Sequence, residues 1–295
     1  MPQAPTSANI FIEKQLDDRI VRLERSLNAD ALSLNGPLLV GVDDILRMAV
    51  EARVAKPPKR DKLAMVVTTT GGYIEVVQRI VATLRKHYRL VDFIVPNYAY
   101  SAGTVLVMSG DAIHMDYYSR LGPIDPQVET RSGRMVSALG YLARYEELIK
   151  KAQRDELTTA EMQILVQRFD QGDLYQYEQS KRLSIDLLKD WLVRYKFKNW
   201  NRTRTRKLPV TQKMKESRAA AIAKQLSDPE KWHVHGYGIS MDMLDRDLNV
   251  MIDDFGQHPR LTQAVRNYHD LLTDYMAKLQ TTGVVHFGGL YRPYM

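Results

Sequence analysis

Two glycine-bearing turns contain the residues of this sequence that are best suited to acyl transfer. The string TTTGGY places Gly71 and Gly72 after an apolar run, where glycine leaves main-chain N–H groups uncovered. The string YSAGT places Ser101 at the expected start of a helix, among small residues that leave its hydroxyl accessible. Read singly, a Gly-Gly pair is a tight turn and a helix-starting serine is a cap. Together they predict a nucleophile that faces an oxyanion site.

Composition removes several other kinds of chemistry. The 295 residues include no cysteine, which excludes thiol nucleophiles, cysteine-bound zinc, iron–sulfur clusters and disulfides. Neither GxxxxGK[ST] nor GxGxxG occurs, so a phosphate loop is excluded as well. The first residues do not read as a signal peptide, and no apolar run approaches the roughly 18 residues of a membrane span. We therefore expect a soluble, cytoplasmic protein without a membrane span.

Both turns follow segments that read as buried parallel strands. The run 63–70 is short, apolar and rich in β-branched residues, the stretch 73–88 has the apolar spacing of an amphipathic helix, and the run 90–96 is a second strand. Strand, helix and strand in this order predict a βαβ unit with a right-handed crossover. In open α/β sheets ligands bind beyond the carboxyl ends of the strands, which is where both turns lie.

The rest of the chain is predicted to be mainly helical. Helices are expected over these ranges: 11–27, 43–54, 136–154, 160–195, 212–226 and 261–281. The sequence thus divides into an N-terminal helical segment (1–60), an α/β core with the two turns (61–130) and a helical C-terminal part packed on the core (131–295). We expect the three segments to form one integrated domain.

The turn motifs resemble a known family. TTTGGY, followed by YSAGTVLVMSGDAIHMDYYSRLGPIDPQ, is similar to the serine dehydrogenase proteinases, which are relatives of signal peptide peptidase A and the Clp proteolytic subunit. The resemblance implies an α/β, crotonase-like (Clp protease-like) spiral of βαβ units with flanking helical layers. It also implies a homo-oligomeric, ATP-independent serine endopeptidase that acts on protein or peptide substrates and needs no cofactor. In that reading Ser101 is the acyl-accepting nucleophile, and Gly71, Gly72 and the N–H of Ala102 form the oxyanion hole.

The general base is less defined. Triad relatives carry a histidine in the turn that corresponds to GPIDP, where this chain has Asp125, so a Ser-His-Asp triad is disfavoured. We interpret Asp125 as a turn residue or as an accessory group that orients another. Dyad relatives use a lysine in or before the following helix, which favours Lys151 over Lys150 and leaves Lys181 as a third choice. A Lys-Lys pair on an amphipathic helix is more often simply a solvated face, which is the favoured interpretation for either lysine taken alone.

Two histidines in KWHVHGYGIS form a further candidate group. Relatives place this segment near the active site, so His235 is a second accessory candidate. For both His233 and His235 structural hydrogen bonding is the favoured role, catalysis the next, and metal binding the last. Only Asp228 and Glu230 lie nearby as further ligands, so we predict no metal site.

The positive charge of the chain has its own competing interpretations. The net charge of +7 is concentrated in the segment 196–218, which has nine Lys or Arg residues and one acid. Such a run is typical of a solvated loop, although RTRTRK beside Trp200 could also contact phosphate, so nucleic acid is a less favoured partner.

Two alternative functions remain open at this point. The first is acyl-coenzyme A chemistry on the same fold, with Glu75 as the carboxylate that moves protons. The second is a non-catalytic oligomeric scaffold that binds nucleic acid through Arg202, Arg204 and Arg206.

Overall fold

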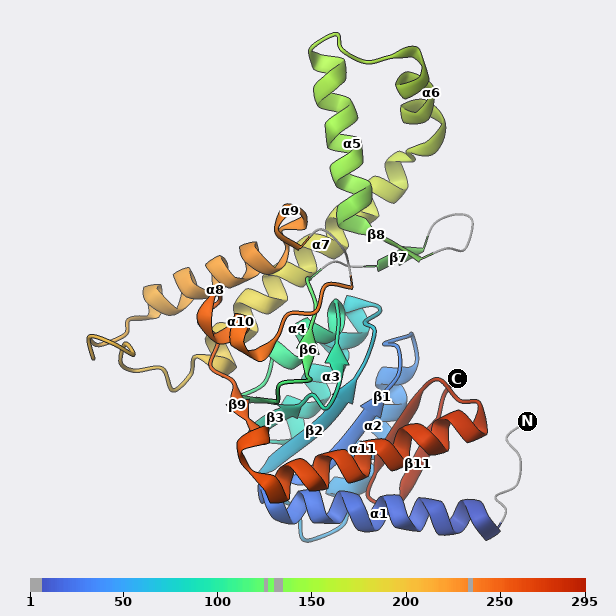
Figure 1. Cartoon of the computed structure of the whole chain (residues 1–295), viewed down its shortest axis with the longest axis vertical. Coiled ribbons are helices and arrows are strands. Elements are labelled where there is room, and N and C mark those ends of the chain that lie inside the picture. Colours follow the sequence, from blue (N-terminus) through green and yellow to red (C-terminus); the bar gives the residue numbers. More distant parts are fainter. Residues whose placement is uncertain (1–6, 125–126, 130–134, 233–235) are drawn as a thin grey trace.

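The protein is built around one mixed sheet between two helical layers (Figure 1). The computed structural model describes residues 7–124, 127–129, 135–232 and 236–295. The sheet has the strand order β11-β10-β1-β2-β3-β5-β9. Its strands are β1 (Asp30–Asn35), β2 (Lys62–Thr68), β3 (Leu90–Ile94), β5 (Ala112–Met115), β9 (Asp253–Asp254), β10 (Val284–Phe287) and β11 (Leu290–Pro293).

The first part of the sheet consists of successive βαβ units. Strands β1, β2, β3 and β5 pair in parallel, and the connecting helices are α2 (Val42–Val54), α3 (Ile74–His87) and α4 (Ala102–Met108). Each of these strands lies beside the preceding one, always on the same side, so the sheet grows in one direction. Right-handed crossovers therefore place all three helices on one face. The predicted α/β class with repeated βαβ units is therefore confirmed.

Alternation along the strands supplies a core on each face of the sheet. In β2, Leu63, Met65 and Val67 pack into the larger cluster with α2, α3 and α4. The intervening Ala64 and Val66 face α1 (Ser7–Leu27) and α11 (Pro259–Leu279), which cover the opposite face (Figure 1). Side chains of a strand point alternately to the two faces, so an uninterrupted apolar strand is what a sheet covered on both sides requires.

A second, two-stranded sheet lies beside the turn that contains Ser101. It pairs β4 (Tyr98–Ala99) in parallel with β6 (Arg120–Leu121). Because β4 precedes α4 directly, this small sheet fixes the chain immediately before Ser101.

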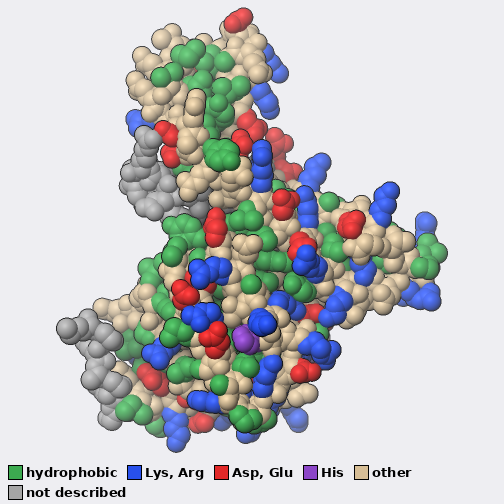
Figure 2. Space-filling view, turned by 180° about the vertical axis from the view of Figure 1, so that it is seen from behind, with side chains coloured by type: hydrophobic (Ala, Val, Ile, Leu, Met, Phe, Trp, Pro, Cys, Tyr) green, Lys and Arg blue, Asp and Glu red, His purple; other side chains and the backbone are tan. Residues whose placement is uncertain are grey.

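A projecting lobe, which we define as residues 138–177, extends away from the sheet (Figure 1). It consists of α5 (Ala138–Gln153), α6 (Thr159–Arg168) and the start of α7 (Gln171–Trp191), and it follows the paired strands β7 (Gln127–Glu129) and β8 (Met135–Ser137). Its own core is small, with Leu142, Leu174 and Tyr177 as the buried members. Helix α6 buries no residue, and Figure 2 shows apolar side chains on the surface of the lobe.

The chain then returns to the sheet. Helix α7 continues into the π-helix η1 (Leu192–Lys196), and α8 (Gln212–Leu226), α9 (Pro229–Trp232), α10 (Met241–Arg246) and the 3-10 helix η2 (Phe255–Gln257) follow. Within the described part of the chain, no helix is both long enough and apolar enough to cross a bilayer.

Several expectations need correction. The single helix predicted over 160–195 is wrong, because the chain breaks at Phe169 and Asp170 caps a new helix by accepting hydrogen bonds from Gly172 N–H and Asp173 N–H. Strands β1, β10 and β11 were not expected. The central sheet takes strands from all three predicted segments of the chain, while the division into those segments stays a prediction.

Candidate active site

Ser101 lies in a strained turn between β4 and α4. Its main chain has φ 54° and ψ −121°, and its side chain is fully buried. The expectation that small neighbours leave the Ser101 hydroxyl accessible is therefore wrong for this conformation, because the surrounding turns cover the side chain. A non-glycine residue adopts this conformation at a cost of about 1–3 kcal/mol, and such strain is concentrated at functional sites. A serine on a sharp strand-to-helix turn is also the arrangement of the nucleophile elbow in other hydrolases.

The glycine turn after β2 meets the serine turn directly. Gly71 has φ +102°, and a Cβ built on it would lie 2.8 Å from Ser101 Cβ and 3.3 Å from Ser101 Oγ. Both the backbone conformation and the space therefore require glycine at this position. The structure thus brings together the two turns that the sequence places thirty residues apart.

Main-chain hydrogen bonds fix the directions of the N–H and C=O groups of Gly71 and Gly72. The N–H of Leu38 donates to Gly71 O (2.8 Å), and the N–H of Tyr73 donates to Leu38 O (2.9 Å). In a parallel bridge of this kind the intervening residue, Gly72, directs its own N–H and C=O to the opposite side. The N–H of Gly71 is engaged, because it donates to Thr69 Oγ1 at 3.0 Å.

Two buried N–H groups remain at this junction. Within the described residues, neither the N–H of Gly72 nor that of Ala102 has a hydrogen-bond acceptor, although both residues are buried. Buried N–H groups without acceptors are rare and call for an explanation. Two such donors beside a strained serine can stabilise an oxyanion. Of the three N–H groups expected for the oxyanion hole, Gly71 thus plays a different part, as the close contact of Ser101.

Two threonines that the sequence interpretation missed hold the turns together. Thr69 N–H donates to Tyr98 O and Tyr100 N–H donates to Thr69 O, both at 3.0 Å. The Thr104 hydroxyl lies 2.9 Å from Ala99 O and 2.8 Å from the carbonyl oxygen of Gly122. The one sequence feature that could have identified Thr69 and Thr104 is their position within TTTGG and SAGT, the strings that contain the two turns.

An aromatic pair borders Ser101 on the strand side. The rings of Tyr98 and Tyr100 stack with centroids 5.0 Å apart. Burial is the main cause that raises the pKa of Tyr100, and the neighbouring Tyr98 adds to it. A Cβ at Gly122 would lie 2.8 Å from Tyr100 Cδ1, so glycine lets the chain after β6 pass close to this ring.

The candidate lysines lie in different surroundings. Lys151 is in the projecting lobe, where its Nζ lies 2.6 Å from Glu161 Oε1 and 3.8 Å from Glu147 Oε1. The hydrogen bond to Glu161 raises the pKa of Lys151, which favours the protonated form and disfavours a general base in this conformation. Lys150 is exposed on the same helix. Lys181 is half-buried on α7, the helix that packs against α4, and it has no ion pair within the described residues.

Asp125, His233 and His235 lie outside the described residues, so their roles stay predictions. The chain on either side of them is anchored close to the site. Ile124 N–H donates to Leu226 O at 2.8 Å. Ile239 exchanges two main-chain bonds with Leu121 of β6, at 3.0 and 2.7 Å, which places the end of KWHVHGYGIS beside the small sheet.

The residues of the alternative functions lie elsewhere. Glu75 is exposed on α3. Arg202 donates to Lys207 O, and Arg204 pairs with Asp245 at 2.8 Å, so part of the basic segment is engaged within the chain. No three metal-binding side chains converge anywhere in the part of the chain that the structure describes.

Comparison with known proteins finds a family match over the region that contains the two turns. Residues 38–165 match the family described as ClpP-like SDH-type serine proteinase, and the match points to a peptidase. Two relatives from Methanocaldococcus jannaschii, the uncharacterized proteins MJ0137 and MJ1495, are 37% and 31% identical over 71 residues, or 24% of this chain. These matches span about a quarter of each relative, 25% and 24% of their lengths.

Among solved structures, ClpP1 from Listeria monocytogenes is similar to part of this chain. It is 11% identical, with a TM-score of 0.29 over 57% of this chain and 91% of that one. Because this score is low, the fold class stands on the sheet itself and on the family match. The predicted resemblance is thus confirmed: over residues 38–165, which include both glycine turns and Ser101, this chain matches the ClpP-like SDH-type serine proteinases.

Proposed function

We propose that this chain is an ATP-independent serine peptidase that uses Ser101 as its nucleophile. The observation that carries the proposal is the junction of the two turns, where a strained, buried serine contacts Gly71 and lies near two buried N–H groups without acceptors. A catalytic serine needs an oxyanion site beside it, and this junction offers one. The family match to serine proteinases supports the same reaction class.

The proposed reaction follows from these groups. Ser101 Oγ forms a bond to the carbonyl carbon of the scissile peptide, while its proton passes to a neutral lysine amine. The carbonyl oxygen becomes an oxyanion that accepts hydrogen bonds from Gly72 N–H and Ala102 N–H. The lysine then returns the proton to the leaving nitrogen as the C–N bond breaks. Water hydrolyses the remaining ester by the same steps.

The substrate in this proposal is an extended peptide. One side of the chain at Gly72 pairs with Leu38, whereas the other side leaves the N–H of Gly72 without an acceptor. An added strand is bound through main-chain hydrogen bonds of this kind, which accounts for recognition of peptides without a specific side chain.

The base in the proposal is a lysine, and two variants separate the candidates. The resemblance favours Lys151, which would first have to leave Glu161. The position of α7 against α4 favours Lys181. If Lys151 is the base, Lys151→Met lowers kcat by about 10²–10⁴-fold, the usual contribution of general-base catalysis. If Lys181 is the base, Lys181→Met has that effect instead. The other variant leaves kcat within a few-fold.

Labelling with a fluorophosphonate probe tests the nucleophile. We expect wild-type protein to be labelled and Ser101→Ala to lose the label. Ser109→Ala is the matched control, because Ser109 is also buried and lies at the other end of α4, where its hydroxyl donates to Leu106 O. Absence of labelling in the wild type, or its loss in Ser109→Ala instead, would contradict the proposal. Self-association and a cytoplasmic location stay predictions that sedimentation and fractionation can check.

A further inference from the structure

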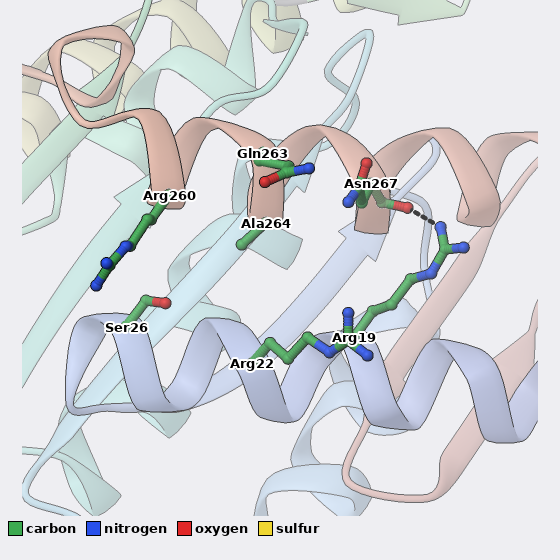
Figure 3. Close-up of a pocket in the computed structure, with 7 residues that line it drawn as sticks. All are labelled: Arg19, Arg22, Ser26, Arg260, Gln263, Ala264 and Asn267. Carbon is green, nitrogen blue, oxygen red and sulfur yellow. Dashed lines mark hydrogen bonds between the residues drawn. The ribbon is translucent and has the colours of Figure 1, made fainter.

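A groove between α1 and α11 collects positively charged side chains far along the sequence from Ser101 (Figure 3). Its volume is about 270 Å³. It is lined by Arg19, Arg22, Ser26, Arg260, Gln263, Ala264 and Asn267. Six of these seven side chains are polar, and none is acidic. The groove shares no residue with the candidate active site.

The three arginines of the groove differ from most arginines of this chain. Arg266, further along α11, forms an ion pair with Asp116, and Arg53 pairs with Asp30 at 2.7 Å. Within the described residues, none of the groove arginines has a carboxylate partner. Arg19 and Arg22 are also three residues apart on one helix, where like charges repel. Guanidinium groups that line one groove without counter-charges give it a positive potential, which favours binding of an anion.

The hydrogen-bond donors of the groove, both charged and neutral, suit a phosphate group. Arg19 donates to the main-chain oxygen of Asn267, a bond that ties its guanidinium to α11 across the groove (Figure 3). The amides of Gln263 and Asn267 and the hydroxyl of Ser26 add neutral donors. Guanidinium groups bind phosphate oxygens in pairs, and neutral donors complete the remaining oxygens.

We propose that this groove binds a compact ligand that carries one or two phosphate groups. Ala264, which has a small side chain, is the one apolar residue that lines the groove. The volume lies just below the range of roughly 300–1,000 Å³ that small-molecule sites occupy, so it fits a headgroup or a diphosphate. An extended polyanion would instead need positive charge along a track. The phosphate can come from a soluble compound or from a phospholipid headgroup.

Calorimetric titration with inorganic pyrophosphate tests the soluble source, and co-sedimentation with phosphatidylcholine vesicles that contain phosphatidic acid tests the lipid source. We expect saturable binding in at least one arm. Arg22→Ala and Arg260→Ala each weaken it about tenfold, the effect of one charge-assisted hydrogen bond. Ala264→Leu, which fills the groove and keeps every charge, weakens it as well.

Arg25→Ala is the charge-matched control, because Arg25 is exposed on the last turn of α1 outside the groove. It should leave binding unchanged. All substituted arginines are at least partly exposed, and circular dichroism confirms that each variant is folded. Failure of both probes to bind overturns the proposal. So does an equal loss in Arg25→Ala and Arg22→Ala, or salt-sensitive binding of a single-stranded oligonucleotide without binding of either phosphate probe.

Discussion

The junction around Ser101 and the projecting lobe represent two different ways of holding chemical groups in place. At the junction, glycine contacts, strained backbone and buried threonine hydrogen bonds leave Ser101 fully buried between two tightly connected turns. In the lobe, α6 has no buried residue, and Met162, Ile164 and Val166 are exposed. The proposed nucleophile and the proposed oxyanion donors thus belong to the more tightly connected of the two regions.

This contrast explains why the base is harder to assign than the nucleophile. Lys151 lies in the lobe and pairs with Glu161 of the same lobe. Its position relative to Ser101 therefore depends on a region with a small core of its own. Regions with few buried contacts open at low free-energy cost, so the lobe rearranges more readily than the junction does.

The largest contrast between the two regions is expected in catalysis. Ser101→Ala removes the nucleophile and should lower kcat by roughly 10⁶-fold, as loss of a catalytic serine does in other proteases. Thr158→Val removes the capping box of α6 in the lobe and should change kcat by less than about tenfold. Hydrolysis of a fluorogenic peptide library measures both. Comparable losses in the two variants would show that the lobe is as much a part of the catalytic centre as the junction.

Glycine replacements should separate the two regions in stability. Gly71→Ala forces a Cβ to 2.8 Å from both Ser101 Cβ and Tyr100 O at a positive φ, so we expect a loss of about 3 kcal/mol in the free energy of unfolding. Gly172→Ala, in the first turn of α7, should change it by less than about 1 kcal/mol. Urea unfolding monitored by circular dichroism provides both values, and equal effects would refute the tight contact.

A smaller difference is expected for the threonines. Thr104→Val removes the hydroxyl that lies between the carbonyl oxygens of Ala99 and Gly122, and it leaves Gly122 N–H with only its longer bond to Ala99 O (3.3 Å), at a cost of about 2 kcal/mol in the free energy of unfolding. Thr158→Val costs about 1 kcal/mol through the lost cap. The same urea experiment applies. A near-neutral Thr104→Val would mean that the junction does not depend on this hydroxyl.

The backbone strain at Ser101 predicts that a glycine there increases stability, whereas the substitutions above decrease it. Ser101→Gly should be more stable than Ser101→Ala by about 1 kcal/mol, because glycine adopts φ 54° and ψ −121° without a Cβ penalty. Thermal unfolding of the two inactive variants compares them without any effect of activity. If alanine is the more stable of the two, the main chain at this residue is not strained.

The smallest expected effect is the titration of the lobe ion pair. The hydrogen bond from Lys151, with those from Thr158, lowers the pKa of Glu161 from 4.5 to about 2. A carboxyl whose pKa is lower in the folded state stabilises it above pH 4.5 and loses that contribution as the pH falls toward 2. Carbon-detected NMR of the Glu161 carboxyl follows this change. A midpoint near 4.5 would show that Lys151 is not held by Glu161 in solution.

The elements around the site followed from sequence patterns because their patterning is local. The strand at 63–70 and the helix at 73–88 closely match β2 and α3, and the helix at 212–226 has the bounds of α8. Their apolar spacing alone identifies the faces that are buried.

Strand β1 could not be predicted in this way. Its sequence DALSLN includes Asp30 and Ser33, both buried. Arg53, Arg60 and the hydroxyl of Tyr88, which are 23, 30 and 58 residues away, are the partners that make burial of Asp30 tolerable. Contacts with residues far along the chain do not produce an alternating apolar pattern within the strand itself, so the pattern of the segment does not predict them.

The meeting of the two turns was predictable from the sequence, but which main-chain N–H groups stay without acceptors was not. The glycines and Ser101 stand out by their spacing after strands. Which main-chain N–H remains available is decided by the Thr69 hydroxyl, which engages Gly71 N–H. That choice depends on a side-chain conformation that spacing does not encode.

The most direct test of the account is a crystal structure of the protein after reaction with diisopropyl fluorophosphate. We predict a phosphorus atom bonded to Ser101 Oγ, with its phosphoryl oxygen about 3 Å from both Gly72 N–H and Ala102 N–H. A phosphoryl group attached to another residue, or an oxygen that contacts neither N–H, would contradict the central claim that these two turns form the catalytic centre.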